Sequence, residues 1–567
     1  MSLPEYKPLW PETAIFWGAG ATADLGISTT GALGKAFYYL GRPEMPLKER
    51  VKKAIGERDS EWEEAVADLL LILGDPYVNN QEDSQLELSK VLQRQFSELS
   101  EDQRYRRASE LKHSYDWKTL YAIIQACPGQ NDNEFQLVDL FNLIDMHIEN
   151  HQGFYAPGVD THSAFIAVER LVPARNTLKM LTTLIHTLDF QQALKTKKGK
   201  LELYSEFAET LYELMLLEGY RLNEQFVERE KRTKRKFYLF SHSFISMNWD
   251  PILLWMLFNA HKGHNQSETP PMIGNPKSTF KMFHDLGHFM GVRQIDGDTP
   301  EVWYPFNETV VQRINDPDHE TGRRVRVGKY YFPHGCSGWR ECPNCGKLTM
   351  YMGSAWGTDG SSALFPPMPL PKFSFGFAAR SAEEEQAQSD GRSDAIQCSF
   401  CGTLTEAYHA PLIMQSSFKG KHPSFIEEVQ RDMRVSLEGA KHIVLMGYSL
   451  PTDDVIYRSI LASRKNRANG RLYCSVVGYS NISTNGWVEG KEIDSYIKKL
   501  QTRDPESPLL KTIQSVKDLF GTEYIRLCSD GVPNVFLDSA GESVSIGKVR
   551  DLLYPEIVFP NREVYRS

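Results

Sequence analysis

Three short apolar runs of the chain end in the same way, and this repetition limits the folds open to it. The runs are Thr13–Trp17, His442–Met446 and Tyr473–Val477, and each leads directly into glycine and small polar residues. Such runs are typical of strands that are buried on both faces, as in a parallel sheet covered by helices. Because ligands bind outside the carboxyl ends of parallel strands, we expect an α/β fold whose strand ends surround one ligand.

A glycine-rich turn follows the first run. It consists of Gly18, Ala19, Gly20, Ala21 and Thr22. Glycines allow a backbone to approach a pyrophosphate closely, and the N–H groups that start a following helix carry about half a positive elementary charge, which favours phosphate. The spacing differs from the usual G-x-G-x-x-G pattern, so an ordinary α/β turn is the alternative. Alone, the turn leaves both interpretations open.

A polar triplet follows another strand-like run, 237–244. Ser246, Asn248 and Asp250 stand just before an apolar helical segment, 251–258. Polar side chains at the end of a parallel strand lie where open α/β sheets bind ligands. Asp250 is also a good helix N-cap, because a proline follows it at the first helical position. Capping would explain Asp250 and would leave Asn248 unexplained.

Composition excludes several classes of protein. The length of 567 residues allows two to four domains, and 41% apolar with 24% charged residues is ordinary for a globular protein. The net charge of −9 gives no general attraction to nucleic acid or to anionic membranes, and the basic run 231–236 is interpreted as a solvated helix end rather than a phosphate-binding patch. Since no signal peptide or membrane-spanning run is found, we expect a cytoplasmic protein with no membrane or direct nucleic-acid partner.

A large helical insertion separates the glycine turn from the polar triplet. Over 43–235, apolar residues recur at three- and four-residue steps, as in amphipathic helices. These stripes are interpreted as packing surface, and a lid or an oligomer contact would use the same pattern. The clearest helical segments are 61–73, 86–99, 135–148, 177–188 and 201–217.

Two C-x-x-C pairs lie in the second half of the chain, just after His334 and Gly335. The pairs are Cys342 with Cys345 and Cys398 with Cys401, and a glycine follows each pair. Four thiolates in two such knuckles predict a tetrahedral zinc ribbon in a reducing compartment. Because all four coordination positions would be thiolates, the site is expected to be structural.

Two stretches around the cysteines predict irregular structure. The segment 261–329 is rich in Gly, Pro, Asn and Asp and is expected to be a long exposed insertion, in which His284 and His288 fit a polar loop better than a metal site. Between the cysteine pairs, 364–372 is rich in proline and 381–393 is acidic and polar. We expect a mobile loop there.

Taken in order, these motifs resemble the signature elements of the sirtuin (SIR2) superfamily, over roughly half of the chain. The resemblance implies a Rossmann-like doubly wound parallel sheet, a zinc-ribbon module with four cysteine ligands, and NAD as the bound ligand. The matching elements are the glycine turn, Gly26 with Ile27, the triplet Ser246, Asn248 and Asp250, His334 with Gly335, the two cysteine pairs, and Gly447, Tyr448, Ser449 and Leu450.

The resemblance also implies a role for each matching residue. His334 would be the general base, Asn248 would orient the ribose and an attacking water, and Asp250 would complete the catalytic set. An imidazole with a pKa near 6.5 can take a proton from a ribose hydroxyl or from water near neutral pH. The residues implied to contact NAD are Gly18, Ala19, Gly20, Thr22, Gly26, Ile27, Ser246, Gly447, Tyr448 and Ser449.

One segment departs from the sirtuin deacylases. Their glycine motif continues Gly-Ile-Pro-Asp-Phe-Arg, and here it continues Gly26, Ile27, Ser28, Thr29, Thr30 and Gly31. The missing aromatic residue shields the reacting ribose from water, so its absence favours hydrolysis. This continuation, the helical insertion and the Gly-Tyr-Ser-Leu-Pro strand end are similar to bacterial SIR2-like proteins of anti-phage defence, which resemble NAD-hydrolysing effectors. The zinc ribbon, which many of those proteins lack, keeps a deacylase open as the alternative.

We therefore expect a SIR2-like NAD⁺ hydrolase that releases nicotinamide and ADP-ribose and depletes NAD during infection. It is expected to be a homo-oligomer, gated by oligomerisation or by a partner or phage-derived activator. An NAD-dependent protein deacylase or ADP-ribosyltransferase, and a noncatalytic NAD or ADP-ribose sensor, are the alternatives. The expected division is 1–42 for the start of the SIR2 core, 43–235 for the helical insertion, 236–330 for the continued core with its polar insertion, 331–410 for the histidine loop and zinc ribbon, and 411–567 for the completed core and C-terminal segment.

Overall fold

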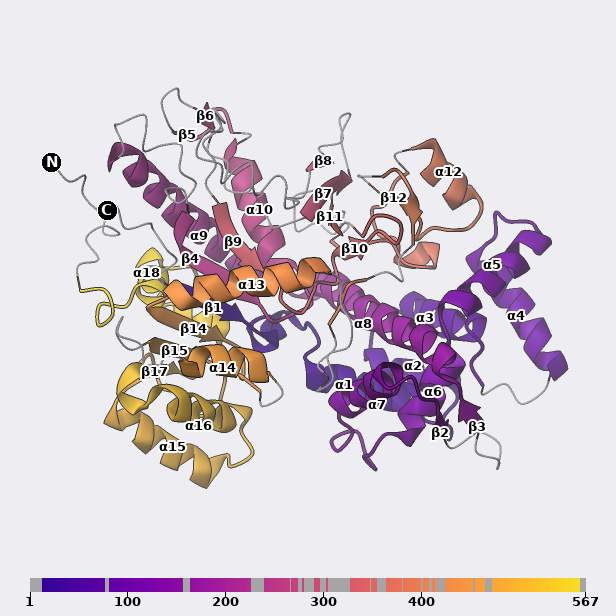
Figure 1. The fold of residues 1–567 in the computed structure, drawn as a ribbon, viewed down its shortest axis with the longest axis horizontal. Coiled ribbons are helices and arrows are strands. Elements are labelled where there is room, and N and C mark those ends of the chain that lie inside the picture. The colour runs from indigo at the N-terminus through magenta and orange to yellow at the C-terminus, as the bar shows by residue number, and fades with distance from the viewer. Residues whose placement is uncertain are drawn as a thin grey trace.

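The computed structural model shows a seven-stranded sheet with helices around it, beside a separate helical body (Figure 1). A small four-cysteine module lies next to the helical body. The described residues are 13–76, 81–156, 164–225, 239–265, 267–273, 278–279, 290–295, 302–303, 327–346, 348–353, 364–379, 381–398, 401–406, 410–413, 416, 424–451, 454–463 and 472–560.

The large sheet has the strand order β16-β17-β15-β14-β1-β4-β9, and all neighbours are parallel except β16 and β17. The predicted α/β class is therefore confirmed. The strands are β1 (Thr13–Trp17), β4 (Leu239–Ser246), β9 (Val327–Tyr331), β14 (His442–Met446), β15 (Tyr473–Val477), β16 (Val488–Glu489) and β17 (Ile525–Cys528).

The chain changes direction across the sheet next to β1. It runs from β1 outward through β4 to β9, then returns to β14 on the other side of β1 and continues to β15 and β17. The last residue of β1, Trp17, lies opposite Ser246 of β4 and Met446 of β14. The carboxyl ends of the three central strands are thus level, and the segments that follow them start side by side.

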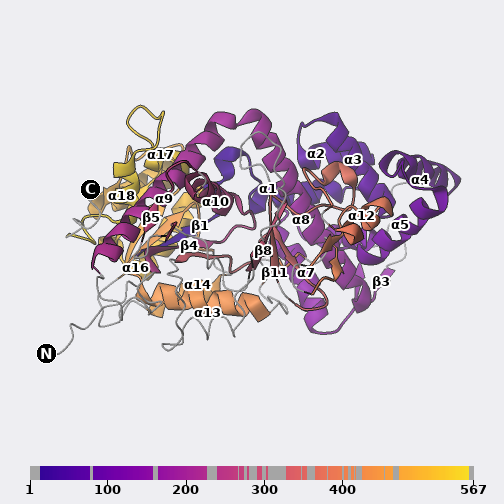
Figure 2. The ribbon, with the colours of Figure 1, turned by 90° about the horizontal axis from the view of Figure 1, so that it is seen from above.

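Helices cover both faces of this sheet (Figures 1 and 2). Along β1, Ile15 and Trp17 belong to one buried cluster and Ala14 and Phe16 to the other, as the two-residue period of a strand requires. One face packs against α9 (Lys198–Gln225), α10 (Ile252–Asn265), α17 (Val532–Phe536) and α18 (Ile546–Leu553). The other face packs against α13 (Ser424–Gly439), α14 (Val455–Ser463), α15 (Lys491–Arg503) and α16 (Pro508–Phe520).

The helical body forms its own apolar core. Each of the five predicted helical segments overlaps a helix, although 86–99 runs four residues past the end of its helix at Gln95. One helix joins the body to the sheet. Leu171 and Leu188 of α8 lie in the core of the helical body, whereas Phe190 and Leu194 of the same helix lie in the core of the sheet. The helices of the body are α1 (Thr30–Leu40), α2 (Leu47–Ile55), α3 (Ser60–Ile72), α4 (Gln81–Gln95), α5 (Glu101–Ser114), α6 (Trp117–Ala126), α7 (Leu137–Glu149) and α8 (Val168–Thr196), with a short pair of strands, β2 (Phe154–Ala156) and β3 (Ala164–Ile166).

The four-cysteine module contains a second sheet with the order β10-β11-β7-β8. Two of its strands come from the predicted polar insertion, most of which lies outside the described residues, as do His284, His288 and the basic run 231–236. The elements are β7 (Met290–Ile295), β8 (Val302–Trp303), β10 (Trp339–Glu341), β11 (Leu348–Gly353), α12 (Ala382–Ser389), β12 (Ile396–Gln397) and β13 (Leu404–Thr405). A short antiparallel pair, β5 (Met272–Ile273) and β6 (Ser278–Thr279), also lies in the polar insertion.

The prediction of a mobile loop between the cysteine pairs is wrong for the residues described. Ser381 caps α12 through its side chain, and Leu370 is completely buried in the core of the helical body. Asp394 is also buried and is paired with Arg107 of α5. Acidic and proline-rich composition suggested disorder, but the partners that order this stretch lie far away along the chain.

Candidate active site

The glycine turn is packed directly against the end of β14. The Gly18 N–H donates to the Met446 carbonyl and the Gly20 N–H donates to the Gly447 carbonyl, both at 2.9 Å. A Cβ on Gly447 would lie 2.1 Å from the Ala21 nitrogen, and φ at Gly447 is +60°. Only glycine fits such an approach. Two of the N–H groups expected to face a pyrophosphate are therefore used to hold two strand ends together.

The helix after the turn begins later than the sequence suggests. Two short 3₁₀ turns, η1 (Ala19–Ala21) and η2 (Ala23–Leu25), intervene before the left-handed Gly26 and the N-cap Thr29 of α1. Helix α9 braces these turns, because the Tyr204 hydroxyl donates to the Ala21 carbonyl. The insertion thus contacts the proposed ligand-binding turn directly.

The polar triplet lies against the same turn. The Asn248 side-chain NH₂ donates to the Gly18 carbonyl at 3.0 Å and to the Thr22 hydroxyl at 3.3 Å. Since these bonds use its donors, the amide oxygen is the group that Asn248 can offer to a ligand. The Asp250 carboxylate accepts from Thr22 at 3.3 Å and from the Ile252 N–H at the start of α10, so the predicted capping role is present. Ser246 donates to the Asn248 carbonyl.

A small polar cavity of about 30 Å³ lies beside this triplet. Burial raises the pKa of the Asp250 carboxyl, and His186 together with the hydrogen bonds from Ile252 and Thr22 opposes that rise. The lining residues are Ala19, Thr22, Ser28, Thr30, Leu33, His186, Met247, Asn248, Trp249 and Asp250. Sheet residues and residues of the helical body therefore meet at one cavity.

His186 is the titratable member of this lining that the sequence did not predict as a site residue. It lies on α8 and is 4% exposed, and its Nδ1 atom has no hydrogen-bond partner among the described residues. One turn further along α8, Asp189 accepts from the Ser28 N–H at 2.9 Å and pairs with Arg58. The segment that replaces the deacylase shield is thus bound to the helical body.

The loop that carries His334 is tied to the triplet through Trp249. The Ser337 N–H donates to the Trp249 carbonyl at 2.6 Å, and the Trp249 indole N–H donates to the Ile413 carbonyl at 3.2 Å. The Ile413 N–H in turn donates to the His334 carbonyl at 2.8 Å. Gly335 is needed here, because its φ is +75° and a Cβ would lie 1.8 Å from the Pro411 carbonyl oxygen.

The His334 ring itself lies against Asp454 and Tyr457. It is 2% exposed, its Nε2 atom is 3.5 Å from an Asp454 carboxylate oxygen, and it meets the Tyr457 ring edge-on. The separation from Asp454 is that of an ion pair if the ring is protonated, and it is too long for a good hydrogen bond. His334 is not among the described residues that line the cavity.

Two residues at the end of β14 that were predicted to contact NAD differ in their exposure. Tyr448 is buried, stacks on Phe16 with ring centroids 5.5 Å apart, and donates from its hydroxyl to Asp454. Ser449 is exposed. Gly26 and Ile27 lie just beyond the glycine turn, and Ile27 is buried in the core of the sheet. Tyr448 therefore has a clear packing role beside the histidine loop.

The four cysteines come together as predicted. Their sulfur atoms all lie within 4.8 Å of one another, with Cys342 to Cys401 at 3.5 Å and Cys345 to Cys398 at 3.8 Å. Four sulfurs at about 2.3 Å from a tetrahedral zinc would be about 3.8 Å apart, so the set could hold a metal ion such as zinc. Glycines with positive φ, Gly346 and Gly402, close the two knuckles.

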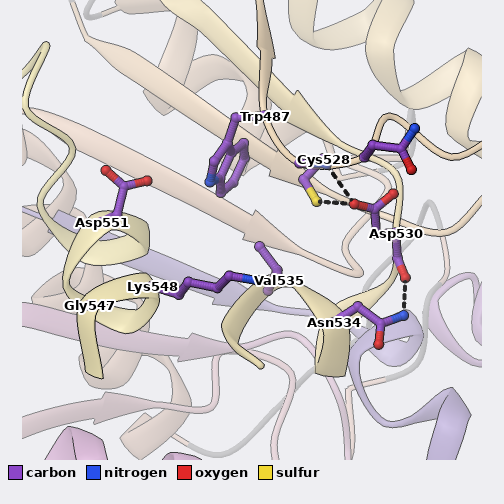
Figure 3. Close-up of a pocket in the computed structure, with 10 residues that line it drawn as sticks. Trp487, Cys528, Asp530, Asn534, Val535, Gly547, Lys548 and Asp551 are labelled. Carbon is purple, nitrogen blue, oxygen red and sulfur yellow. Dashed lines mark hydrogen bonds between the residues drawn. The ribbon is translucent and has the colours of Figure 1, made fainter. Parts of the chain in front are cut away.

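A larger hollow of about 470 Å³ lies at the same edge of the sheet, beyond the end of β17 (Figure 3). Trp487 and Lys548 project into it, and the Arg526 guanidinium lies over the Trp487 ring, 3.9 Å from the ring centroid. Its remaining lining residues are Asn485, Gly486, Cys528, Asp530, Asn534, Val535, Gly547 and Asp551. It contains no residue predicted from the sequence as part of a site.

Comparison with known proteins assigns no family to the chain. Neither a scan against protein-family models nor a search of curated proteins finds a match for the chain. Within the described residues, every helix is too short or too polar to cross a membrane.

Proposed function

We propose that the chain is an NAD⁺ hydrolase of the SIR2 kind, which releases nicotinamide and ADP-ribose. The observation that carries the proposal is the meeting of four separate segments at one sheet edge: the glycine turn, the triplet at Asn248, the His334 loop and the Gly447 turn. Numbered along the chain, the six parallel strands have the order 3-2-1-4-5-6 from β9 to β17, which is the order of dinucleotide-binding Rossmann sheets.

The chemistry of these groups fits cleavage at the nicotinamide ribose. Loss of nicotinamide leaves positive charge on the ribose, which the buried Asp250 carboxylate and the Asn248 amide oxygen would stabilise. His334 would take a proton from a ribose hydroxyl. Zinc at the four cysteines would be structural and would hold the His334 loop in place, since no coordination position is left for substrate.

Water, rather than an acyl-lysine, is proposed as the acceptor. The segment from Ser28 to Thr30 carries no aromatic shield; Ser28 is bound to Asp189 and Thr29 caps α1. The four-cysteine cluster is the observation that favours the second candidate, an NAD-dependent protein deacylase.

Substrate entry requires the site to open. The cavity of about 30 Å³ is far smaller than the roughly 300–1,000 Å³ of small-molecule pockets, and His334 is buried against Asp454. A closed resting state suits an effector whose NAD consumption is switched on by a partner, a phage-derived activator or a change of oligomeric state. We propose the role in anti-phage defence and the gating of NAD consumption together with the hydrolase activity.

Incubation with NAD⁺, with and without an acetyl-lysine peptide, tests the proposal. We expect nicotinamide release without peptide, and a loss of at least about 100-fold in Asn248→Ala and His334→Ala. Strict dependence on the peptide would favour the deacylase. Tight NAD⁺ binding without turnover, with the activating conditions supplied, would favour a sensor.

A further inference from the structure

The helical insertion contributes a side chain to the cavity beside Asn248. His186 lies in the stretch where α8 passes from the core of the helical body to that of the sheet, and its ring is 6.4 Å from the ring of Trp249, the residue between Asn248 and Asp250. It is 4% exposed, and Nδ1 lacks a hydrogen-bond partner in the part of the chain that the structure describes. Such a buried polar atom is costly unless a ligand or a water satisfies it.

The cavity has the size and polarity for one water molecule. Its volume of about 30 Å³ exceeds the roughly 10–15 Å³ that a cavity needs to hold a water, and a buried water needs two to four polar partners. His186 and Asn248 both line it, and each has an acceptor to offer: a ring nitrogen of a neutral imidazole and the Oδ1 atom of the amide.

Burial of His186 favours the neutral form of its ring. Burial lowers the pKa of His186. The carboxylates of Asp189 and Asp250 and a hydrogen bond to the Ser28 backbone act in the opposite direction and raise this pKa. A neutral imidazole carries its proton on one nitrogen and accepts at the other.

We propose that His186 is a further catalytic residue of the site, which binds the attacking water together with Asn248 and accepts its proton. The inference rests on the proposed NAD⁺ hydrolysis. A water that donates one hydrogen to each of two acceptors directs an oxygen lone pair away from both. That lone pair is then available to the ribose.

The step balances as follows. The bond between ribose C1′ and the nicotinamide nitrogen breaks, and its electron pair returns to the nicotinamide ring, which leaves neutral. The water oxygen forms the new bond to C1′, and one water proton passes to a ring nitrogen of His186 and from there to solvent. The products are nicotinamide, ADP-ribose and one proton, and His334 remains the group that acts on the ribose hydroxyl.

The test compares two reactions catalysed by the full chain. Both break the bond between the ribose and nicotinamide, and only hydrolysis consumes water. Hydrolysis is measured as ADP-ribose formed from NAD⁺, and base exchange is measured as labelled nicotinamide incorporated into NAD⁺, which needs no water. In His186→Phe we expect hydrolysis to fall about 100-fold and base exchange to change less than about threefold. His186→Gln, which retains an acceptor oxygen, should recover part of the hydrolysis.

A second buried histidine provides the control. His242 lies in β4 and bonds to the Tyr554 hydroxyl, away from the cavity. Any loss in His242→Phe should affect hydrolysis and exchange equally. If His186→Phe and His186→Gln also lower both reactions in parallel, or change neither, His186 has no part in water attack. If the wild-type protein performs neither reaction, the proposed function itself fails.

Discussion

The turn at Asn248 lies between two regions of the molecule, one belonging to the sheet and one to the helical body. The difference between these regions shows what a sequence can reveal about a site. On the sheet side lie the glycine turn and the His334 loop, which are short motifs at strand ends. On the helical side lie His186 and Asp189 of α8, a helix of 29 residues in which nothing in the local sequence marks those two positions. The sheet side supplies groups that short sequence motifs mark, and the helical side supplies groups that no local motif marks.

The largest effect is expected from the four-cysteine cluster, on which both sides depend. On the sheet side, Phe332 of the histidine loop packs against Trp339, with ring centroids 5.2 Å apart; on the helical side, Asp394 pairs with Arg107. A structural zinc contributes on the order of 10 kcal/mol to folding. Cys398→Ser, or removal of metal by a chelator, should therefore lower the thermal unfolding midpoint sharply and abolish nicotinamide release. Metal analysis that finds no zinc, with normal folding of the variant, would remove the cluster from the account.

On the helical side, loss of Asp189 should have the next largest effect. Asp189→Ala leaves Arg58, which is 10% exposed, without its partner and the Ser28 N–H without its acceptor. Removal of one partner from such a buried pair costs roughly 3–5 kcal/mol. Chemical denaturation measures the loss, and Lys53→Ala, at the exposed pair with Glu49, is the control, with a change under about 1 kcal/mol. Equal losses in the two variants would mean that Asp189 does not hold α8 to the Ser28 segment.

On the sheet side, Gly447→Ala tests the close approach of two strand ends. The new methyl group would meet the Ala21 nitrogen at 2.1 Å in a backbone with φ of +60°. Left-handed strain and overpacking together cost roughly 2–5 kcal/mol, and the displaced glycine turn should lose nicotinamide release. Gly541→Ala has a similar φ of +75° and open space around it, so only the strain of roughly 1–2 kcal/mol should appear. Identical unfolding curves for the two variants would contradict the packing described.

The smallest effect is expected from His442, a histidine of the core that contrasts with His186. Burial lowers the pKa of His442 to about 3, well below the unfolded value near 6.5. The unfolded state therefore binds more protons below pH 6.5, and stability should fall as the pH drops from 6.5 towards 3, by roughly 1 kcal/mol per pH unit from this group. His442→Gln should flatten the dependence of the unfolding free energy on pH in that window without changing the ratio of hydrolysis to base exchange. A change in that ratio would place His442 in the chemistry, against its position in the core.

The sequence predicted most of the sheet side because its signals are local. Thr13–Trp17, His442–Met446 and Tyr473–Val477 are strands with the expected bounds, and the four cysteines cluster. Strand β17 was not predicted, and α12 was mistaken for a mobile loop, because Asp394 is ordered by Arg107, 287 positions away in the chain. His186 could not be predicted as a site residue for the same reason: only the fold brings α8 to the cavity.

The central claim is that the groups gathered around Asn248 transfer the ADP-ribosyl group of NAD⁺ to water. It is tested most directly by quantifying nicotinamide and ADP-ribose after incubation of the full chain with NAD⁺ alone, beside the Asn248→Ala variant. The account predicts equal amounts of the two products from the wild-type chain and at least about 100-fold less from the variant. Product formation that is unchanged in Asn248→Ala would contradict it.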